Sequence, residues 1–193
     1  MRVTLPIVLL ALCGAAWAKD VDGHYAVKGT GQMTCAAFNT ALSDQSPDAK
    51  AALNWVAGYL TAVNATTTET FDIVSWQSEG MITRTLSVRC ASVPNMPLAR
   101  AVSDMVGMMI PDRISSNDEL VTITVATRSR TIYRSVIRRM QKKLERLEED
   151  VDASGEFDAI TQETLRRYQA SVGIAETGFP DSVTLLKLFS DER

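Results

Sequence analysis

The sequence predicts a mainly α-helical protein built from two small helical domains joined by a short extended segment. Apolar residues recur at intervals of three and four along most of the chain, which is the period of an amphipathic helix. Only residues 120–125 (LVTITV) clearly show the β-branched alternation of a strand. With 46% hydrophobic and 22% charged residues, the 193-residue chain has the composition of a folded globular protein.

Charge and residue content argue against several functions. The net charge is −3, so charge alone does not draw the chain to nucleic acid or to an anionic membrane. His24 is the only histidine, which disfavours a histidine-rich metal site or a histidine-based triad. No nucleophile motif, phosphate-binding loop or facing carboxylate pair stands out. We therefore expect no enzyme, and no catalytic residue, metal, cofactor or nucleic-acid partner.

Residues 1–18 have the layout of a secretory signal peptide. Arg2 provides the positive start, Leu5 to Leu12 the apolar run, and Ala16-Trp17-Ala18 the small residues before a cleavage site. The apolar run is shorter than the ~20 residues of a membrane-spanning helix, so no membrane span is expected. We expect cleavage after Ala18 and a periplasmic location, with Cys13 lost together with the signal peptide.

Residues 19–115 form the first predicted domain, in which helical signals recur. One helix is expected over residues 34–42 with Thr34 as its N-cap, and Ser46-Pro47-Asp48 starts a second. A third is expected around residues 81–90, and a fourth follows it. The apolar faces of the second and fourth helices consist of Leu53, Val56, Leu60 and Val63, and of Leu98, Ala101, Val102, Met105 and Met109.

Two cysteines, Cys35 and Cys90, remain once the signal peptide is removed. An exported protein with an even number of cysteines suggests a disulfide formed in an oxidising compartment. We expect the intramolecular bond Cys35–Cys90, with two buried free thiols or an intermolecular bridge as the alternatives. On chain-entropy grounds, closing a loop of this length contributes about 4 kcal/mol to stability.

Three short motifs of this domain resemble one known family. They are MTCAAF at Met33–Phe38, GYL at Gly58–Leu60 and CASVPNMPLARAV at Cys90–Val102. Over roughly residues 30–110 the chain resembles the small periplasmic HdeA/HdeB-type proteins. The resemblance implies a helical fold with one disulfide. It also implies, as an alternative function only, the acid-activated chaperone activity of some members.

Residues 116–130 are expected to form an extended linker between the domains. The preceding turn-forming run at residues 115–119 leads into the strand-like residues 120–125. Residues around 26–32 or 70–75 could pair with this strand, but an ordered connector on a domain surface is favoured.

The second predicted domain, residues 131–193, contains three helices separated by glycine turns. The first helix is long and carries Arg138 and Arg139 on a charged outer face. Asp158 is expected to cap the second helix, which stops near Gly173, and Asp181 to cap the third. The expected inward residues are Ile132, Val136, Ile137, Met140, Leu144 and Leu147, then Ile160, Leu165, Tyr168 and Val172, and finally Leu185, Leu186 and Leu188.

Four consecutive motifs of this domain strongly resemble a second family. They are the helix Val136–Leu144 with its Gln141, SGEFDAIT at Ser154–Thr161, TLRRYQASVGI at Thr164–Ile174 and TGFPDSVTLLKL at Thr177–Leu188. Over about residues 132–189 they resemble the peptidoglycan-binding domain found at the ends of many cell-wall hydrolases. The resemblance implies a compact three-helix fold with peptidoglycan as its partner. Ser154 and Asp158 depart from the usual aspartate and glycine of that loop.

A peptidoglycan binder needs a shallow groove with donors and acceptors for sugar hydroxyls, amides and peptide carboxylates. The candidate binding residues are Arg139, Gln141, Glu156, Asp158, Thr161, Arg167, Tyr168 and Gln169. Several of these residues could instead have a purely structural role, without contact to a ligand. Tyr168 and Phe157 suit a core, the glutamines suit hydrogen bonds to loop backbone, and the arginines suit a solvated helix face.

The favoured function is an exported, non-catalytic peptidoglycan-binding protein whose first domain binds a periplasmic protein partner or senses stress. One alternative is a periplasmic acid-stress chaperone of the HdeA type. The other is an accessory subunit or an enzyme of peptidoglycan remodelling. Suppression of client aggregation at acid pH and release of fragments from purified wall distinguish these alternatives.

Overall fold

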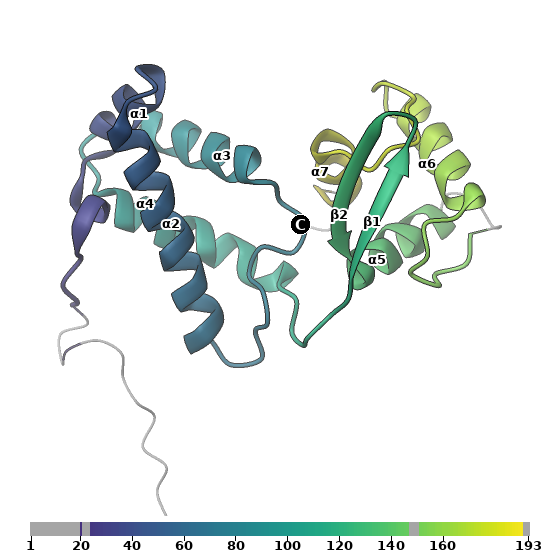
Figure 1. Cartoon of the computed structure of the whole chain (residues 1–193), viewed down its shortest axis with the longest axis horizontal. Helices are drawn as coiled ribbons and strands as arrows, with labels where there is room; N and C mark the ends of the chain where they lie inside the picture. The colour runs from purple at the N-terminus through teal and green to yellow at the C-terminus, as the bar shows by residue number, and fades with distance from the viewer. Residues whose placement is uncertain (1–19, 21–23, 147–150, 191–193) are drawn as a thin grey trace, which may run out of the picture.

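The computed structural model describes residue 20, residues 24–146 and residues 151–190. The signal peptide expected at residues 1–18, and Leu147 of the expected apolar face, lie outside the described residues. The described part of the chain contains seven α-helices and one two-stranded sheet, which confirms the mainly α fold class (Figure 1). Among these helices, none is both long enough and apolar enough to cross a membrane.

A bundle of four helices forms what we call the first module, residues 29–112. It comprises η1 (Gly29–Gln32), α1 (Cys35–Ser43), α2 (Pro47–Thr66), α3 (Glu79–Ser92), α4 (Leu98–Met109) and η2 (Ile110–Asp112). Its buried cluster draws Phe38, Val56, Leu86 and Val102 from the four helices. A bond joins the Sγ atoms of Cys35 and Cys90, which confirms the expected disulfide and ties α1 to α3.

Local sequence signals set the helix starts of the first module. The Thr34 hydroxyl accepts a hydrogen bond from the backbone N–H of Ala37 at 3.2 Å, which confirms the expected cap of α1. Ser46 precedes α2 as expected, but its hydroxyl donates to the carbonyl of Ala41 at 3.4 Å instead of capping the helix. Pro47 in the first turn has no N–H that needs a partner, and the backbone N–H of Ala49 donates to the carbonyl of Ser46 at 3.0 Å.

Residues 120–125 form a strand, but its partner is neither of the segments that the sequence suggested. β1 (Leu120–Val125) pairs in antiparallel fashion with β2 (Arg128–Tyr133). The long helix expected from Ile132 therefore begins only at Arg134, and Ile132 belongs to β2. This hairpin is more than a connector, because Ile123 and Ile132 are 2% and 3% exposed within the core of the C-terminal helices.

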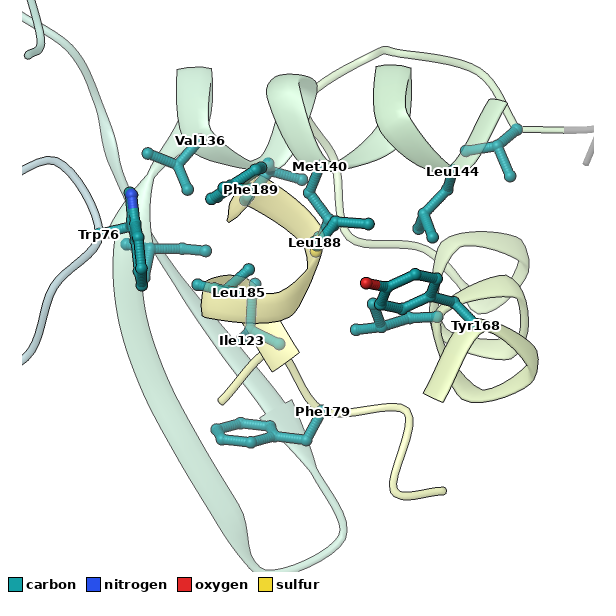
Figure 2. Packing of buried hydrophobic residues seen from close by; sticks show 14 of the residues in the cluster. Trp76, Ile123, Val136, Met140, Leu144, Tyr168, Phe179, Leu185, Leu188 and Phe189 are labelled. Carbon is teal, nitrogen blue, oxygen red and sulfur yellow. The ribbon is translucent and has the colours of Figure 1, made fainter. Parts of the chain in front are cut away.

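The second module, residues 120–190, adds α5 (Arg134–Glu145), α6 (Ala159–Ser171) and α7 (Ser182–Ser190) to the hairpin. Figure 2 shows their side chains meeting in one cluster. Two residues expected to face inward are exposed instead: Ile160 by 53% and Leu186 by 41%. Threonines occupy part of the buried faces of α6 and α7, so the polar Thr161 and Thr184 take inward positions that hydrophobicity does not predict.

The two modules share this core. Trp76, from the loop between α2 and α3, is 3% exposed and packs among the residues of the second module. Its ring meets that of Phe189 in α7 edge to face, with 5.6 Å between the centroids (Figure 2). Ile114, which follows η2, joins the same cluster. The modules are therefore packed against each other and are not merely tethered.

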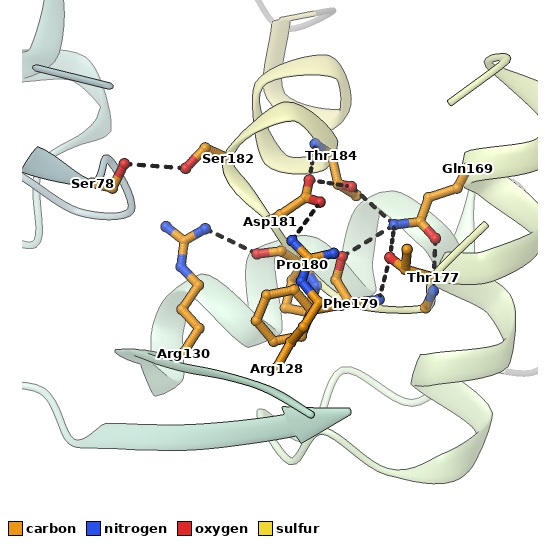
Figure 3. A network of polar contacts seen from close by, with 11 residues as sticks. Ser78, Arg128, Arg130, Gln169, Thr177, Phe179, Pro180, Asp181, Ser182 and Thr184 are labelled. Atoms are coloured by element: carbon orange, nitrogen blue, oxygen red, sulfur yellow. Dashed lines mark hydrogen bonds and ion pairs between the residues drawn. The ribbon is translucent and has the colours of Figure 1, made fainter. Parts of the chain in front are cut away.

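Polar contacts accompany this packing. The Tyr133 hydroxyl donates to a carboxylate oxygen of Asp72 at 2.7 Å. Burial, followed by this hydrogen bond, raises the pKa of Tyr133, so the hydroxyl stays protonated as a donor. The guanidinium of Arg130 donates to the carbonyl of Trp76. It also donates to the carbonyl of Pro180 at 2.9 Å, as Figure 3 shows. Strand β2 thus links the Trp76 loop to the start of α7.

Candidate functional site

Two loops of the second module repeat one pattern of side chains. The α5–α6 loop contains Gly155 and Asp158, and Thr161 follows in the first turn of α6. With identical spacing, the α6–α7 loop contains Gly178 and Asp181, and Thr184 follows in the first turn of α7. In each case a glutamine of the preceding helix is completely buried and bonds the loop: Gln141 of α5 in the first and Gln169 of α6 in the second.

Gln141 holds the first loop through both ends of its amide. Its Oε1 accepts from the backbone N–H of Gly155 at 2.8 Å. Its Nε2 donates to the carbonyl of Glu156 at 2.8 Å and to the Thr161 hydroxyl at 3.0 Å. A buried amide with all its groups paired fixes its partners, because breaking any bond leaves a buried polar group unsatisfied.

Gln169 does the same for the second loop, as Figure 3 shows. Its Oε1 accepts from the backbone N–H of Gly178 at 2.7 Å. Its Nε2 lies 2.9 Å from the Thr184 hydroxyl and 3.1 Å from the carbonyl of Phe179. The loop-bonding role that sequence reasoning offered for both glutamines is confirmed.

Both aspartates cap the helix that follows them, as expected. Asp158 accepts from the backbone N–H of Thr161 at 2.7 Å, and Asp181 accepts from that of Thr184 at 2.9 Å. Hydrogen bonds from the Thr161 hydroxyl and backbone lower the pKa of Asp158. Burial acts to raise the pKa of Asp181, but hydrogen bonds from Thr184 and Arg128 outweigh it and lower the value.

The first loop, held in this way, presents charged groups to solvent. We call Arg134, Arg138, Glu156 and Asp158 the loop face. Arg138 donates from Nε to the carbonyl of Ser154 at 3.2 Å. Arg134 places Nη1 3.8 Å from Oε1 of Glu156, whose side chain is 76% exposed. This alternation of guanidinium and carboxylate groups offers both donors and acceptors on a fixed backbone.

Gly155 allows the loop to approach α5 this closely. Its φ of +84° lies in the left-handed region that favours glycine. A Cβ at this position would lie 2.8 Å from Cγ of Arg134 and 2.9 Å from Cγ of Arg138. Any larger residue would therefore push the loop and the two arginines apart.

The structure separates the eight candidate residues. Glu156 and Asp158 lie together on the loop face, and Arg167 lies on the outer face of α6, with Nε 3.9 Å from Oε1 of Glu163. Four candidates are interior and cannot meet a ligand at the surface of this conformation: Gln141, Thr161, Tyr168 and Gln169. Tyr168 belongs to the core cluster, as its structural interpretation expected.

Arg139 lies at the junction of the modules and not on a solvated helix face. Its Nη2 is 3.0 Å from a carboxylate oxygen of Asp112 in the first module. Its guanidinium carbon lies 4.2 Å from the centroid of the Phe189 ring. The first module covers this side of α5, which the periodicity of α5 alone cannot show.

Comparison with known protein families decides what this module resembles. Residues 133–188 match the family described as "Putative peptidoglycan binding domain". The match runs from the end of β2 into α7 and includes both glutamine-held loops, so we call the second module the peptidoglycan-binding module. Neither a curated protein nor a solved structure matches the chain.

Sequence reasoning missed Arg134 and Arg138 as parts of the exposed site. It also missed the repeat itself, although the spacing of glycine, aspartate and threonine is visible in the sequence: GEFDAIT and GFPDSVT align without a gap. Within the described residues, no group of three or more His, Cys, Asp or Glu side chains could hold a metal ion.

Proposed function

We propose that the chain is an exported, non-catalytic protein that binds peptidoglycan through its peptidoglycan-binding module. The family match over residues 133–188 is the observation that carries this proposal. The signal-peptide layout of residues 1–18 supports export to the periplasm, with cleavage after Ala18. The Cys35–Cys90 disulfide agrees with that compartment.

The exposed candidates Glu156, Asp158 and Arg167, joined by Arg134 and Arg138 of the loop face, are the proposed wall contacts. Their guanidinium groups can donate to peptide carboxylates and sugar oxygens, and their carboxylates can accept from hydroxyls and amides. The buried glutamines support this surface indirectly, because they fix the loop that carries it. Such fixation reduces the ordering cost of binding.

The first module is the proposed contact to a periplasmic protein partner or the part that senses stress. An apolar groove of about 260 Å³ at its boundary with α7 is lined by Met81, Met105, Met108 and Met109. Flexible methionine side chains suit contact with an apolar protein surface. Met108 is 53% exposed, so this groove opens to solvent.

Co-sedimentation of the mature chain, Lys19–Arg193, with purified insoluble peptidoglycan tests the proposed function. The chain should enter the pellet, and soluble wall fragments should compete with this binding. The supernatant should contain no newly released wall fragments. A chain that stays in the supernatant contradicts wall binding, whereas released fragments favour the alternative of a wall-remodelling enzyme or its accessory.

A second proposed function is an acid-stress chaperone of the HdeA type. The helical first module closed by the Cys35–Cys90 bond favours it. The mature chain should then suppress aggregation of an unfolded client at acid pH, and reduction of the disulfide should abolish this activity. Client aggregation that proceeds unchanged at every pH would remove this function.

A further inference from the structure

The junction of the two modules contains a cavity with a volume of about 360 Å³, which both polar and apolar side chains line. The first module contributes Ser75 and Asp112, Arg113 follows it directly, and α5 contributes Ser135, Val136 and Arg139. Ligand pockets have volumes of roughly 300–1,000 Å³ and often lie between domains. This cavity has the size for one or two small amino-acid residues and exists only while the modules are packed together.

Ser75 provides a buried hydroxyl without a partner. The residue is 4% exposed, and none of the described residues forms a hydrogen bond with its Oγ. Buried hydroxyls in native proteins are usually paired, since an unpaired one has lost its hydrogen bonds to water without replacement. Because Ser75 lines the cavity, rotation about its one side-chain bond can offer the hydroxyl to a group bound there.

Arg113 gives the cavity a positive charge that its neighbours neutralise only loosely. Its Nε and Nη1 donate to the neutral carbonyls of Glu69 and Ile110, each at 3.0 Å. Its nearest carboxylate oxygen is Oε2 of Glu69, which lies 3.8 Å from Nη2 of Arg113. The Glu69 side chain is 84% exposed, whereas that of Arg113 is 26% exposed. With Arg139 and Asp112 paired to each other, the cavity favours an anion.

We infer that this cavity binds the terminal carboxylate of a short peptide, such as the peptide part of the cell wall. Arg113 and Ser75 bind the carboxylate, and the apolar wall at Val136 and Ile114 accommodates a small side chain. The source of the peptide rests on the proposed wall-binding function. The carboxylate site itself rests on the cavity.

The test is an NMR titration of the mature chain with N-acetyl-D-alanyl-D-alanine and, separately, with its C-terminal amide. The acid should shift the amide resonances of Ser75, Arg113 and Val136, and the amide should bind at least about tenfold more weakly because it lacks the charge. Absence of shifts at these residues, or equal binding of acid and amide, overturns the inference.

Two variants separate binding from folding. Ser75→Ala removes only the unpaired hydroxyl, so binding should weaken about tenfold while the unfolding midpoint stays equal or rises. Arg113→Gln should weaken binding further. Matched controls are Ser92→Ala on α3 and Arg166→Gln on α6, whose side chains do not line the cavity; these should bind like the unmodified chain. Unchanged binding in both cavity variants overturns the inference.

The titration and the wall co-sedimentation can fail separately. A chain that enters the wall pellet but does not bind the dipeptide overturns the cavity assignment and leaves wall binding in place. If the chain binds the dipeptide with the expected variant pattern but does not enter the pellet, the carboxylate site is supported. The wall is then the wrong source of its peptide.

Discussion

Gln141 and Gln169 show how a polar residue can be both fully buried and stabilising. One side-chain amide offers an acceptor and two donors, which is the set that a glycine turn and the following helix need. In each loop the acceptor takes the glycine N–H and a donor reaches the helix threonine. Neither Leu nor Glu could satisfy the same partners.

Replacement of either glutamine should therefore be costly. Gln141→Ala or Gln169→Ala leaves a buried glycine N–H and a carbonyl without partners, so the free energy of unfolding should fall by about 3 kcal/mol or more. Chemical denaturation measures this. Gln32→Ala, which removes an exposed amide that donates to Val27, is the control and should change stability little. A loss below about 1 kcal/mol at the buried positions would contradict their role.

The charge of Asp158 should make the stability of the chain depend on pH. Asp158→Ala should cost about 1 kcal/mol near neutral pH, because α6 loses its N-cap. The folded-state pKa is lowered, so this stabilisation is complete above the unfolded value of about 3.9 and is lost as pH falls through the folded pKa. In urea unfolding, the difference between the variant and the unmodified chain should shrink at about pH 3. A difference that persists undiminished there argues against a charged cap.

At the scale of the elements, the sequence predicts helices better than the hairpin. The caps at Thr34, Asp158 and Asp181 are local signals, and the structure contains all three. The hairpin turn at residues 126–127 has no Asn-Gly or Asp-Gly pair, and Ala126 takes φ +53° without such a signal. Because β2 buries few side chains, its arginine-rich sequence resembles a helix start.

Two glycine substitutions should have opposite effects. Gly155→Ala places a Cβ at positive φ and against two arginine side chains, so it should destabilise the peptidoglycan-binding module by about 1–2 kcal/mol. Gly58→Ala is the matched control within α2, where an added Cβ has nothing within 4 Å. It should stabilise the chain by about 0.5–1 kcal/mol through helix propensity. Thermal unfolding measures the change in stability for both variants. Changes of the same sign in the two variants would contradict the loop geometry.

At the scale of the whole molecule, the shared core explains what the sequence could not predict. Trp76 precedes α3 in sequence yet packs on α7, and Arg139 faces Asp112 of the first module. Such contacts depend on how the modules dock, which leaves no local pattern. The family resemblance of the second module was predictable because its motifs lie within one continuous segment.

Trp76→Ala tests the coupling between the modules. Removing this buried ring should destabilise the core of the second module by about 3–5 kcal/mol and should speed amide hydrogen exchange in α5 and α7. Trp55→Ala is the control, because Trp55 packs against the core of the first module. If Trp76→Ala leaves amide hydrogen exchange in α5 and α7 unchanged, the two modules are independent of each other.

The central claim is that the loop face and Arg167 bind peptidoglycan. Its most direct test is a wall-binding isotherm for the full mature chain carrying Glu156→Gln, Asp158→Asn and Arg167→Gln. Asparagine still caps a helix, so the fold should persist. The matched control carries Glu79→Gln, Asp48→Asn and Arg84→Gln, which make the same charge changes at exposed sites of the first module.

We predict that the triple variant on the peptidoglycan-binding module loses at least about tenfold in affinity for insoluble peptidoglycan, which is the effect of one lost charged hydrogen bond. The matched control should bind like the unmodified chain. Equal binding of both variants and the unmodified chain, or a loss confined to the first-module control, would contradict the account.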